Sequence, residues 1–181
     1  MQTSQQKVIV LDFGAQYGQL IARRVRDLHV YSEIMPCDAT AEEISAAGPS
    51  AIILSGGPAS VNEEGAPRVD PKIYELGIPV LGFCYGHQIT AVTLGGTVFH
   101  PEVGEYGRAE LHVKADSKLF ADTPANQTVW MSHFDAVNNV PEGFVVTAST
   151  DVCPVAAMEN AERKIYTTQF HPEVKHIEYG Q

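Results

Sequence analysis

The stretch GFCYGHQ, residues 82 to 88, places a cysteine where a thiol nucleophile could form. An apolar run ends at Phe83, and a helical pattern begins directly after Cys84. Glycines at positions 82 and 86 suit the sharp strand-to-helix turn that lifts a nucleophile above a sheet. A cysteine at a helix N-terminus has a lowered pKa, because the unpaired N–H groups there stabilise its thiolate. The pattern predicts a reactive thiol at Cys84.

The other two cysteines, Cys37 and Cys153, have no such setting and are interpreted as packed side chains. Three cysteines at long, irregular spacings fit neither a disulfide framework nor a zinc site. They suit a reducing compartment, and the N-terminal stretch lacks the basic and apolar regions of a signal peptide. We therefore expect a cytoplasmic protein without a metal site.

A histidine and a glutamate separated by a proline occur twice, in FHPEV at 99 to 103 and again at 170 to 174. Such a pair could be a general base together with the carboxylate that orients it. Both copies follow a strand-like run, so local spacing does not distinguish a catalytic copy from an inert one.

The segment LSGGPAS, residues 54 to 60, follows another apolar run, where open α/β sheets bind their ligands. Its glycines allow backbone N–H groups to approach a ligand closely. The segment lacks the aspartate of a pyrophosphate-binding loop, and no GxxxxGK[ST] motif occurs in the chain. It is a candidate oxyanion hole rather than an ATP site.

The first half of the chain alternates strand and helix patterns. Apolar runs at 7–12, 30–35, 50–54 and 78–83 are separated by helical patterns at 19–28, 39–47 and 70–76. This rhythm predicts a doubly wound α/β fold whose mostly parallel sheet has helices on both faces. Strand patterns then follow one another without helices at 107–114, 128–132, 144–150, 154–160 and 164–170. They predict an antiparallel extension of the sheet or a small second sheet.

Composition limits the classes of partner. Twelve Lys and Arg against 22 Asp and Glu give a formal net charge of −10, so the basic footprint of a nucleic-acid-binding protein is missing. No run approaches the ~20 apolar residues of a membrane span. At 181 residues, 44% of them hydrophobic, and without a linker, we expect one domain over 1–181.

Several ordered motifs together resemble the triad-type (class I) glutamine amidotransferases. They are GFCYGHQ, LSGGPAS and TTQFHPEV. Other stretches are similar to the glutaminase domain of the GMP synthase family in particular: DFGAQYGQLIARRVR (12–26), EYGRAEL (105–111), WMSHFD (130–135) and HPEVKH (171–176). The resemblance covers nearly the whole chain.

The resemblance implies a role for each matching residue. Cys84 would attack the side-chain amide of glutamine, with the N–H groups of Gly57 and Tyr85 holding the oxyanion. His171 would shuttle the proton and Glu173 would orient its ring. The residues implied to contact the substrate are Gln88, Ala59, Ser132, His133 and Phe134.

The resemblance also separates the two FHPEV copies. The family motif lies in the last strand of the domain and follows TTQF, as His171 does, whereas GGTV precedes His100. It implies that His100 and Glu102 form a repeated turn without a catalytic role. The remaining histidines are expected to be solvated or packed; they are His29, His87, His112, His133 and His176.

One position departs from the family pattern. The family usually has glycine where this chain has Phe134, and the backbone there passes close to the substrate. The departure implies either a narrowed glutamine pocket or an altered backbone conformation.

The family's activity implies a glutaminase that has no cofactor of its own and delivers ammonia to a GMP synthase ATP-pyrophosphatase domain or subunit. That partner, absent from this chain, would use ATP and Mg²⁺ to aminate XMP to GMP. Two alternatives remain: a glutaminase feeding another acceptor, as in carbamoyl phosphate or anthranilate synthesis, and a non-catalytic binding subunit. EYGRAEL and DFGAQY favour the first reading over another acceptor, and the complete Cys84, His171 and Glu173 set favours an enzyme.

Overall fold

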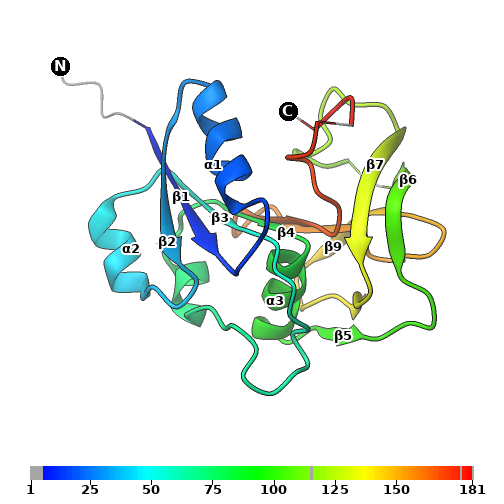
Figure 1. The fold of residues 1–181 in the computed structure, drawn as a ribbon, viewed down its shortest axis with the longest axis horizontal. Coiled ribbons are helices and arrows are strands. Elements are labelled where there is room, and N and C mark those ends of the chain that lie inside the picture. Colours follow the sequence, from blue (N-terminus) through cyan, green and yellow to red (C-terminus); the bar gives the residue numbers. More distant parts are fainter. Residues whose placement is uncertain (1–5, 115, 176, 181) are drawn as a thin grey trace.

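A nine-stranded sheet is the central feature of the fold (Figure 1). The structure is a computed structural model that describes residues 6–114, 116–175 and 177–180. The strand order is β2 (Tyr31–Pro36), β1 (Lys7–Asp12), β3 (Ala51–Leu54), β4 (Val80–Phe83), β11 (Ile165–Thr168), β10 (Ala157–Asn160), β9 (Val145–Ser149), β6 (Glu105–Val113) and β7 (Asn126–His133). The first five strands are mutually parallel. The remaining pairings are antiparallel.

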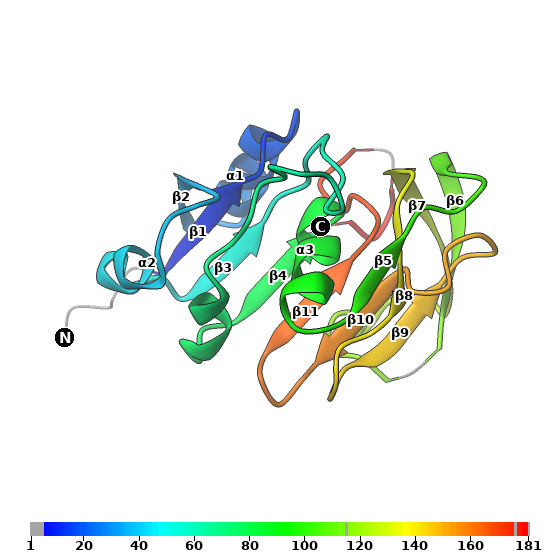
Figure 2. The same ribbon diagram turned by 90° about the horizontal axis from the view of Figure 1, so that it is seen from below.

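Helices cover both faces of the parallel half, as the sequence predicts (Figure 2). Alternate residues of each strand point to opposite faces, so Val10 packs with α1 (Gly18–Asp27) while Leu11 packs on the other side. That other face holds the helix α2 (Ala41–Ala47), the 3-10 helix η1 (Pro71–Glu75) and the helix α3 (Tyr85–Thr93). The two faces form separate hydrophobic clusters.

Local signals in the sequence correctly mark the helix α2. The Thr40 hydroxyl accepts a hydrogen bond from the Glu43 N–H, and the Glu43 carboxylate accepts one from the Thr40 N–H. This capping box satisfies two N–H groups that the helix itself leaves unpaired. Gly48, in the left-handed conformation, ends the helix.

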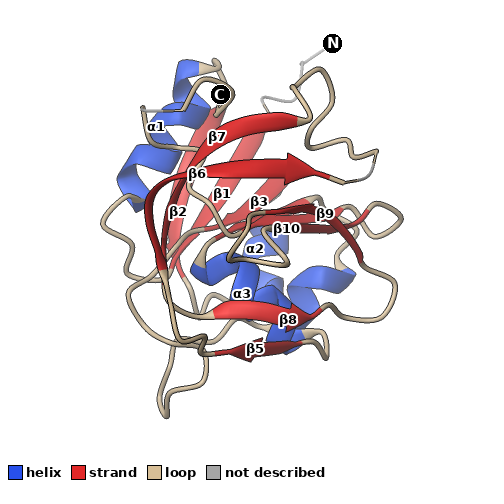
Figure 3. Ribbon diagram, turned by 90° about the vertical axis from the view of Figure 1, so that its right-hand side faces the viewer, coloured by secondary structure: helices blue, strands red, loops and turns tan. Residues whose placement is uncertain are grey.

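The antiparallel part contains both arrangements that the sequence allows, an extension of the main sheet and a small second sheet. β10, β9, β6 and β7 extend the main sheet, and a separate two-stranded sheet pairs β5 (Thr97–Phe99) with β8 (Ala136–Asn139) (Figure 3). The strands β5 and β8 are too short for a periodic pattern to predict them. Their pairing carries the first FHPEV copy to the side of the loop that follows β7.

The position of β11 decides where the chemistry can occur. This last strand lies beside β4, parallel to it, and Thr168 pairs with Phe83. Parallel neighbours end at the same edge of a sheet, so the segments after β4 and β11 emerge together. Cys84 follows β4 and His171 follows β11.

Among the described helices, none combines the length and the apolar character that crossing a bilayer requires.

Candidate active site

Cys84 forms a strained turn between β4 and α3. Its φ of 50° and ψ of −102° are rarely adopted by a residue with a side chain. Backbone strain of this kind costs about 1–3 kcal/mol and persists only where the surrounding structure imposes it. The Cys84 N–H donates to the Thr168 carbonyl oxygen at 2.8 Å, and the Cys84 carbonyl oxygen accepts from the Gln88 N–H at 3.1 Å. The turn is therefore held from β11 and from α3.

The two glycines of the predicted turn are required by close backbone contacts. A Cβ atom on Gly86 would lie 2.5 Å from the Leu54 carbonyl oxygen, and one on Gly82 would lie 2.7 Å from the Gly86 carbonyl oxygen. Neither position can accept a side chain without moving the backbone. The glycine pattern in the sequence thus correctly marks the tight packing of α3 against β3 and β4.

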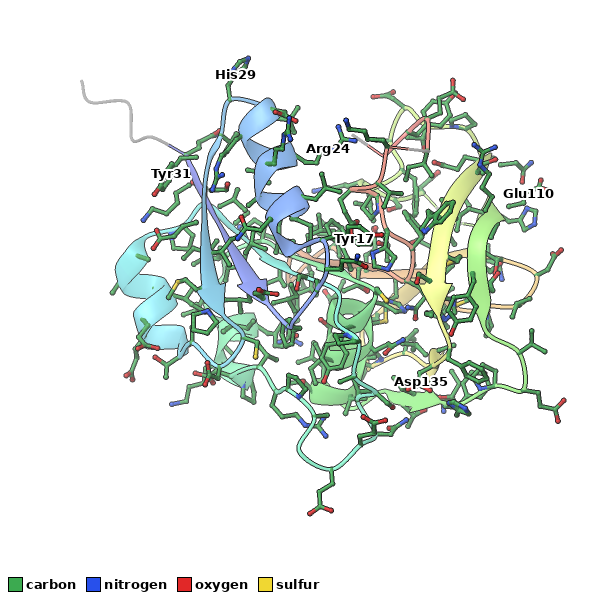
Figure 4. The ribbon with its side chains drawn as sticks, in the orientation of Figure 1. Tyr17, Arg24, His29, Tyr31, Glu110 and Asp135 are labelled. Atoms are coloured by element: carbon green, nitrogen blue, oxygen red, sulfur yellow. The ribbon has the colours of Figure 1, made fainter. Side chains whose placement is uncertain are left out.

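His171 and Glu173 form a buried pair beside Cys84. The Nδ1 atom of His171 lies 2.8 Å from Oε1 of Glu173, and both residues are buried. The Arg24 Nε–H donates to the Glu173 carbonyl oxygen at 3.1 Å, so α1 holds the segment from the other side. Figure 4 shows Arg24 on the part of α1 that faces the C-terminal segment. The second FHPEV copy has the geometry of an oriented imidazole.

The surroundings of His171 favour its charged form. Burial alone lowers the pKa of an imidazole, but the hydrogen bonds and charges of Cys84 and Glu173 outweigh it and raise the pKa of His171 to about 10. The raised pKa favours the imidazolium form of His171 near neutral pH. The Cys84 thiol lies 3.6 Å from the Ser132 carbonyl oxygen.

This raised pKa predicts a pH-dependent contribution to stability. A folded-state pKa above the ordinary value of 6.5 stabilises the native state fully below pH 6.5, and the contribution is lost as the pH rises through about 10. The difference in unfolding free energy between wild type and His171→Gln should therefore shrink from pH 6 to pH 10. Urea unfolding at several pH values measures it. A difference that stays constant over this range would contradict the assignment.

A cavity of about 600 Å³ brings the predicted site residues together, within the ~300–1,000 Å³ typical of small-molecule sites. Cys84 and His171 line it, and the ring of Tyr17 lies edge-on to that of His171 at 6.3 Å. Figure 4 shows Tyr17 at the start of α1. The other predicted residues that line the cavity are Gly57, Ala59, Gln88, Ser132, His133 and Phe134.

Tyr85 and Glu173 are the two predicted site residues that do not line the cavity themselves. Tyr85 begins α3, so its N–H is one of the first-turn groups without a partner in the helix, while its hydroxyl donates to the Pro67 carbonyl oxygen at 2.6 Å. Glu173 lies behind the ring of His171 and is 4% exposed. The position of Tyr85 suits a residue that would act through its backbone N–H. The position of Glu173 suits a residue that would act through the ring of His171.

Comparison with known proteins identifies the family. The family described as glutamine amidotransferase class-I matches residues 9–181. The chain belongs to the class-I glutamine amidotransferases.

Individual relatives agree with this assignment. The amidotransferase is 61% identical to the glutamine-hydrolysing GMP synthase of Streptomyces coelicolor over 96% of its own length, and 54% identical to that of Clostridium novyi over its full length. It spans only 33% and 35% of those relatives. A solved protein of Thermoplasma acidophilum, described as a candidate GMP synthase subunit, is 34% identical, with a TM-score of 0.88 over 97% of this chain and 88% of that one.

Two of the predicted substrate contacts in this amidotransferase have side chains that are already engaged. The Gln88 amide donates to the Asp135 carbonyl oxygen at 2.7 Å and to Oε1 of Gln169 at 3.1 Å, which leaves its oxygen for a ligand. The His133 ring lies 2.9 Å from the Asp135 carbonyl oxygen and 3.1 Å from the Glu105 carboxylate. Any contact from His133 to glutamine would therefore come from its backbone.

Phe134 packs against a residue of the first FHPEV copy. Its ring stacks on that of His100 with centroids 4.1 Å apart and planes inclined by 17°. Phe134 does not have a positive φ, so its backbone is not in the left-handed conformation that would favour glycine. This arrangement favours the interpretation that the rings of Phe134 and His100 together form a wall of the pocket. It disfavours the alternative that the Phe134 side chain narrows the pocket.

Phe134→Gly is expected to raise the KM for glutamine several-fold, mainly because glycine gives the loop after β7 more backbone freedom, while kcat changes less. Steady-state ammonia release at varied glutamine measures both constants. A lower KM would mean instead that the Phe134 side chain crowds the substrate.

Several residues that line the cavity were not singled out from the sequence, among them Asp135, Ser60, Tyr17 and Tyr106. Asp135 and Ser60 end two of the motifs that carry the family resemblance, WMSHFD and LSGGPAS. Their position at the end of a motif could have indicated them. Tyr17 and Tyr106 lie inside two other such motifs, DFGAQYGQLIARRVR and EYGRAEL.

A cluster of potential metal ligands, with two of its three residues buried, includes His133 of the cavity wall. Ligand atoms of Glu105, His133 and Cys153 lie within 4.8 Å of one another. Hydrogen bonds already occupy the histidine, and the Thr150 hydroxyl donates to Glu105 at 2.7 Å. Burial and then the Glu105 charge raise the pKa of Cys153 to about 12, which disfavours the thiolate that a metal needs. The cluster is best explained as support for the loop after β7.

The other histidines differ in burial. His87 is fully buried, with hydrogen bonds to Thr167 and Val155, and its burial lowers its pKa to about 3, so the ring is neutral. His112 is partly exposed on β6, with Nδ1 2.9 Å from the Asn126 side-chain oxygen, and His29 is exposed. Neither lines the cavity. His176 lies outside the described residues.

Proposed function

We propose that this chain hydrolyses L-glutamine to glutamate and ammonia through Cys84, His171 and Glu173. The observation that carries the proposal is the meeting of a strained cysteine turn and a buried histidine–glutamate pair in one cavity, at the ends of adjacent parallel strands. Membership of the amidotransferase family supports the same substrate.

The first half of the reaction forms a thioester. The Cys84 thiolate attacks the side-chain carbonyl carbon of glutamine, and the N–H groups of Gly57 and Tyr85 stabilise the oxyanion. The His171 imidazolium donates its proton to the leaving nitrogen, the C–N bond breaks, and ammonia departs. A γ-glutamyl thioester on Cys84 remains, and His171 is left neutral.

The second half hydrolyses that thioester. Neutral His171 takes a proton from water, the resulting hydroxide attacks the thioester carbon, and the C–S bond breaks to release glutamate and the thiolate. Glu173 keeps the ring oriented and stabilises its charge in both halves. The sum is glutamine and water converted to glutamate and ammonia, with no cofactor held by this chain.

We further propose that residues 1–181 form one glutaminase domain whose ammonia goes to a synthetase domain or subunit that aminates XMP with ATP and Mg²⁺. The relatives named GMP synthase are about three times as long as the segment matched here, which leaves room for that activity. A cytoplasmic location belongs to the same proposal, because Cys37, Cys84 and Cys153 are all free thiols.

Ammonia released without an activated acceptor would waste glutamine, so the isolated chain is expected to be a weak glutaminase. Addition of a GMP synthase ATP-pyrophosphatase domain with ATP, Mg²⁺ and XMP should raise hydrolysis by about 5-fold to about 150-fold, the usual range of coupling between sites. GMP should form only in the complete mixture. Full activity of the chain alone, unchanged by partner and nucleotides, would contradict the coupling, and tight ATP binding by the chain would contradict the division of labour.

A further inference from the structure

The first FHPEV copy lies at the same cavity as the second, but it is built differently. His100 follows β5 and lines the cavity, and its Nδ1 atom lies 2.7 Å from Oδ1 of Asp135. Glu102, the glutamate of its own motif, is exposed and does not orient the ring. The side chain of His100 is itself 69% exposed, whereas His171 is buried. His100 therefore does not repeat the geometry of a base with its carboxylate.

Asp135 connects the loop that carries His100 to the loop that carries Gly57. Its side chain is 8% exposed, and one carboxylate oxygen accepts a hydrogen bond from His100 while the other accepts one from the Ser60 hydroxyl. Ser60 lies three residues after Gly57, on the loop that follows β3. Figure 4 shows Asp135 beside the end of β7. We refer to Ser60, Asp135 and His100 as the Asp135 bridge.

The bridge is anchored to the floor of the cavity through the backbone. The Asp135 carbonyl oxygen accepts from the Gln88 amide at 2.7 Å, and it lies 2.9 Å from Nδ1 of His133. Hydrogen bonds to a buried carboxylate are stronger than those between neutral groups, and they fix geometry in a low-dielectric site. The stack of His100 on Phe134 adds a second contact between the loop after β5 and the loop after β7.

We propose that the Asp135 bridge positions the walls of the glutamine pocket, and that His100 is a positioning residue for substrate binding rather than a second base. This inference rests on the proposed glutaminase activity of the same cavity. The loop that carries Gly57 and Ser60 also carries Ala59, a predicted substrate contact that lines the cavity, so an anchor on this loop keeps a wall of the pocket in place for binding. The Ser60 hydroxyl ties this loop to the Asp135 carboxylate by a hydrogen bond. The hydrogen bond from His100 keeps that carboxylate oriented from the solvent side.

His100→Ala is expected to raise the KM for glutamine about tenfold, since a hydrogen bond to a charged group is lost, while kcat stays within a few-fold. His112→Ala is the matched control, because His112 is a partly exposed histidine that is also bonded to a polar side chain but does not line the cavity. It should leave both constants unchanged. An unchanged KM in His100→Ala would overturn the proposal.

Two further variants separate the contacts of His100. His100→Asn retains an N–H donor for Asp135 without the stack, and His100→Phe retains the stack without the donor. The bridge predicts that asparagine restores most of the affinity and phenylalanine little. Restoration by phenylalanine alone would assign the effect to packing and overturn the bridge.

The link to the Gly57 loop is tested by Ser60→Ala combined with His100→Ala. Both act through Asp135, so the double variant should raise KM less than the product of the two single effects. Independent, multiplicative effects would overturn the bridge. Thermal unfolding of each variant identifies a general loss of stability.

Glutamine binding by Cys84→Ser, measured by calorimetry, provides a readout without turnover. His100→Ala in that background should raise the Kd for glutamine by about the same tenfold. Absence of glutamine binding in Cys84→Ser, together with absence of hydrolysis in the wild-type chain, would count against the proposed function itself. Binding that is unchanged by His100→Ala would count against the bridge alone.

Discussion

His171→Ala is expected to lower kcat for glutamine hydrolysis by about 10²-fold to about 10⁴-fold, the usual contribution of a positioned general acid–base group. The variant removes the group that protonates the leaving nitrogen and deprotonates the attacking water. The KM should change much less, because the ring of His171 meets the reacting atoms rather than the amino-acid end of the substrate. Initial rates of ammonia release over a range of glutamine concentrations measure both constants.

His100→Ala is the informative comparison, since it changes the equivalent residue of the other FHPEV copy. Its kcat should remain within a few-fold of wild type while its KM rises. Equal losses of kcat in the two variants would mean that the copies are not distinguished as described. A larger loss of kcat in His100→Ala would reverse the assignment.

Cys84→Ser is expected to lower kcat by about 10⁴-fold or more, because a serine hydroxyl is far less acidic than a thiol and no thioester can form. The fold should be retained, since sulfur is replaced by a smaller atom at a turn held by backbone hydrogen bonds. Cys37→Ser is the matched control and should keep wild-type turnover, because Cys37 does not line the cavity. Substantial hydrolysis by Cys84→Ser would show that the nucleophile lies elsewhere.

Much of the parallel half of the fold could be predicted from the sequence because its signals are local. The buried strands β1, β3 and β4 are continuous apolar runs, and the helix α2 has a capping box at Thr40 and a glycine at its end. Gly82 and Gly86 mark the turn at Cys84 for a steric reason that a single sequence displays. The third predicted helix is instead the short 3-10 helix η1, since Pro71 and Gly77 leave room for only five residues.

The arrangement of the site depended on strand order, which no local pattern contains. The resemblance selected His171, but only the pairing of β11 with β4 places His171 beside Cys84. The pairing of β5 with β8 likewise brings His100 to Asp135, a contact across 35 positions. From the sequence, Glu102 was the candidate partner of His100 because it lies only two residues away. In the structure the partner of His100 is Asp135 instead.

The identity of the nucleophile is tested most directly by covalent labelling. A glutamine-mimicking electrophile such as diazo-oxo-norleucine, incubated with the wild-type chain and followed by peptide mapping, should form one adduct on Cys84. Excess glutamine should slow the labelling, and His171→Ala should reduce its rate. An adduct on Cys37 or Cys153 instead, or labelling that glutamine does not slow, would contradict the account.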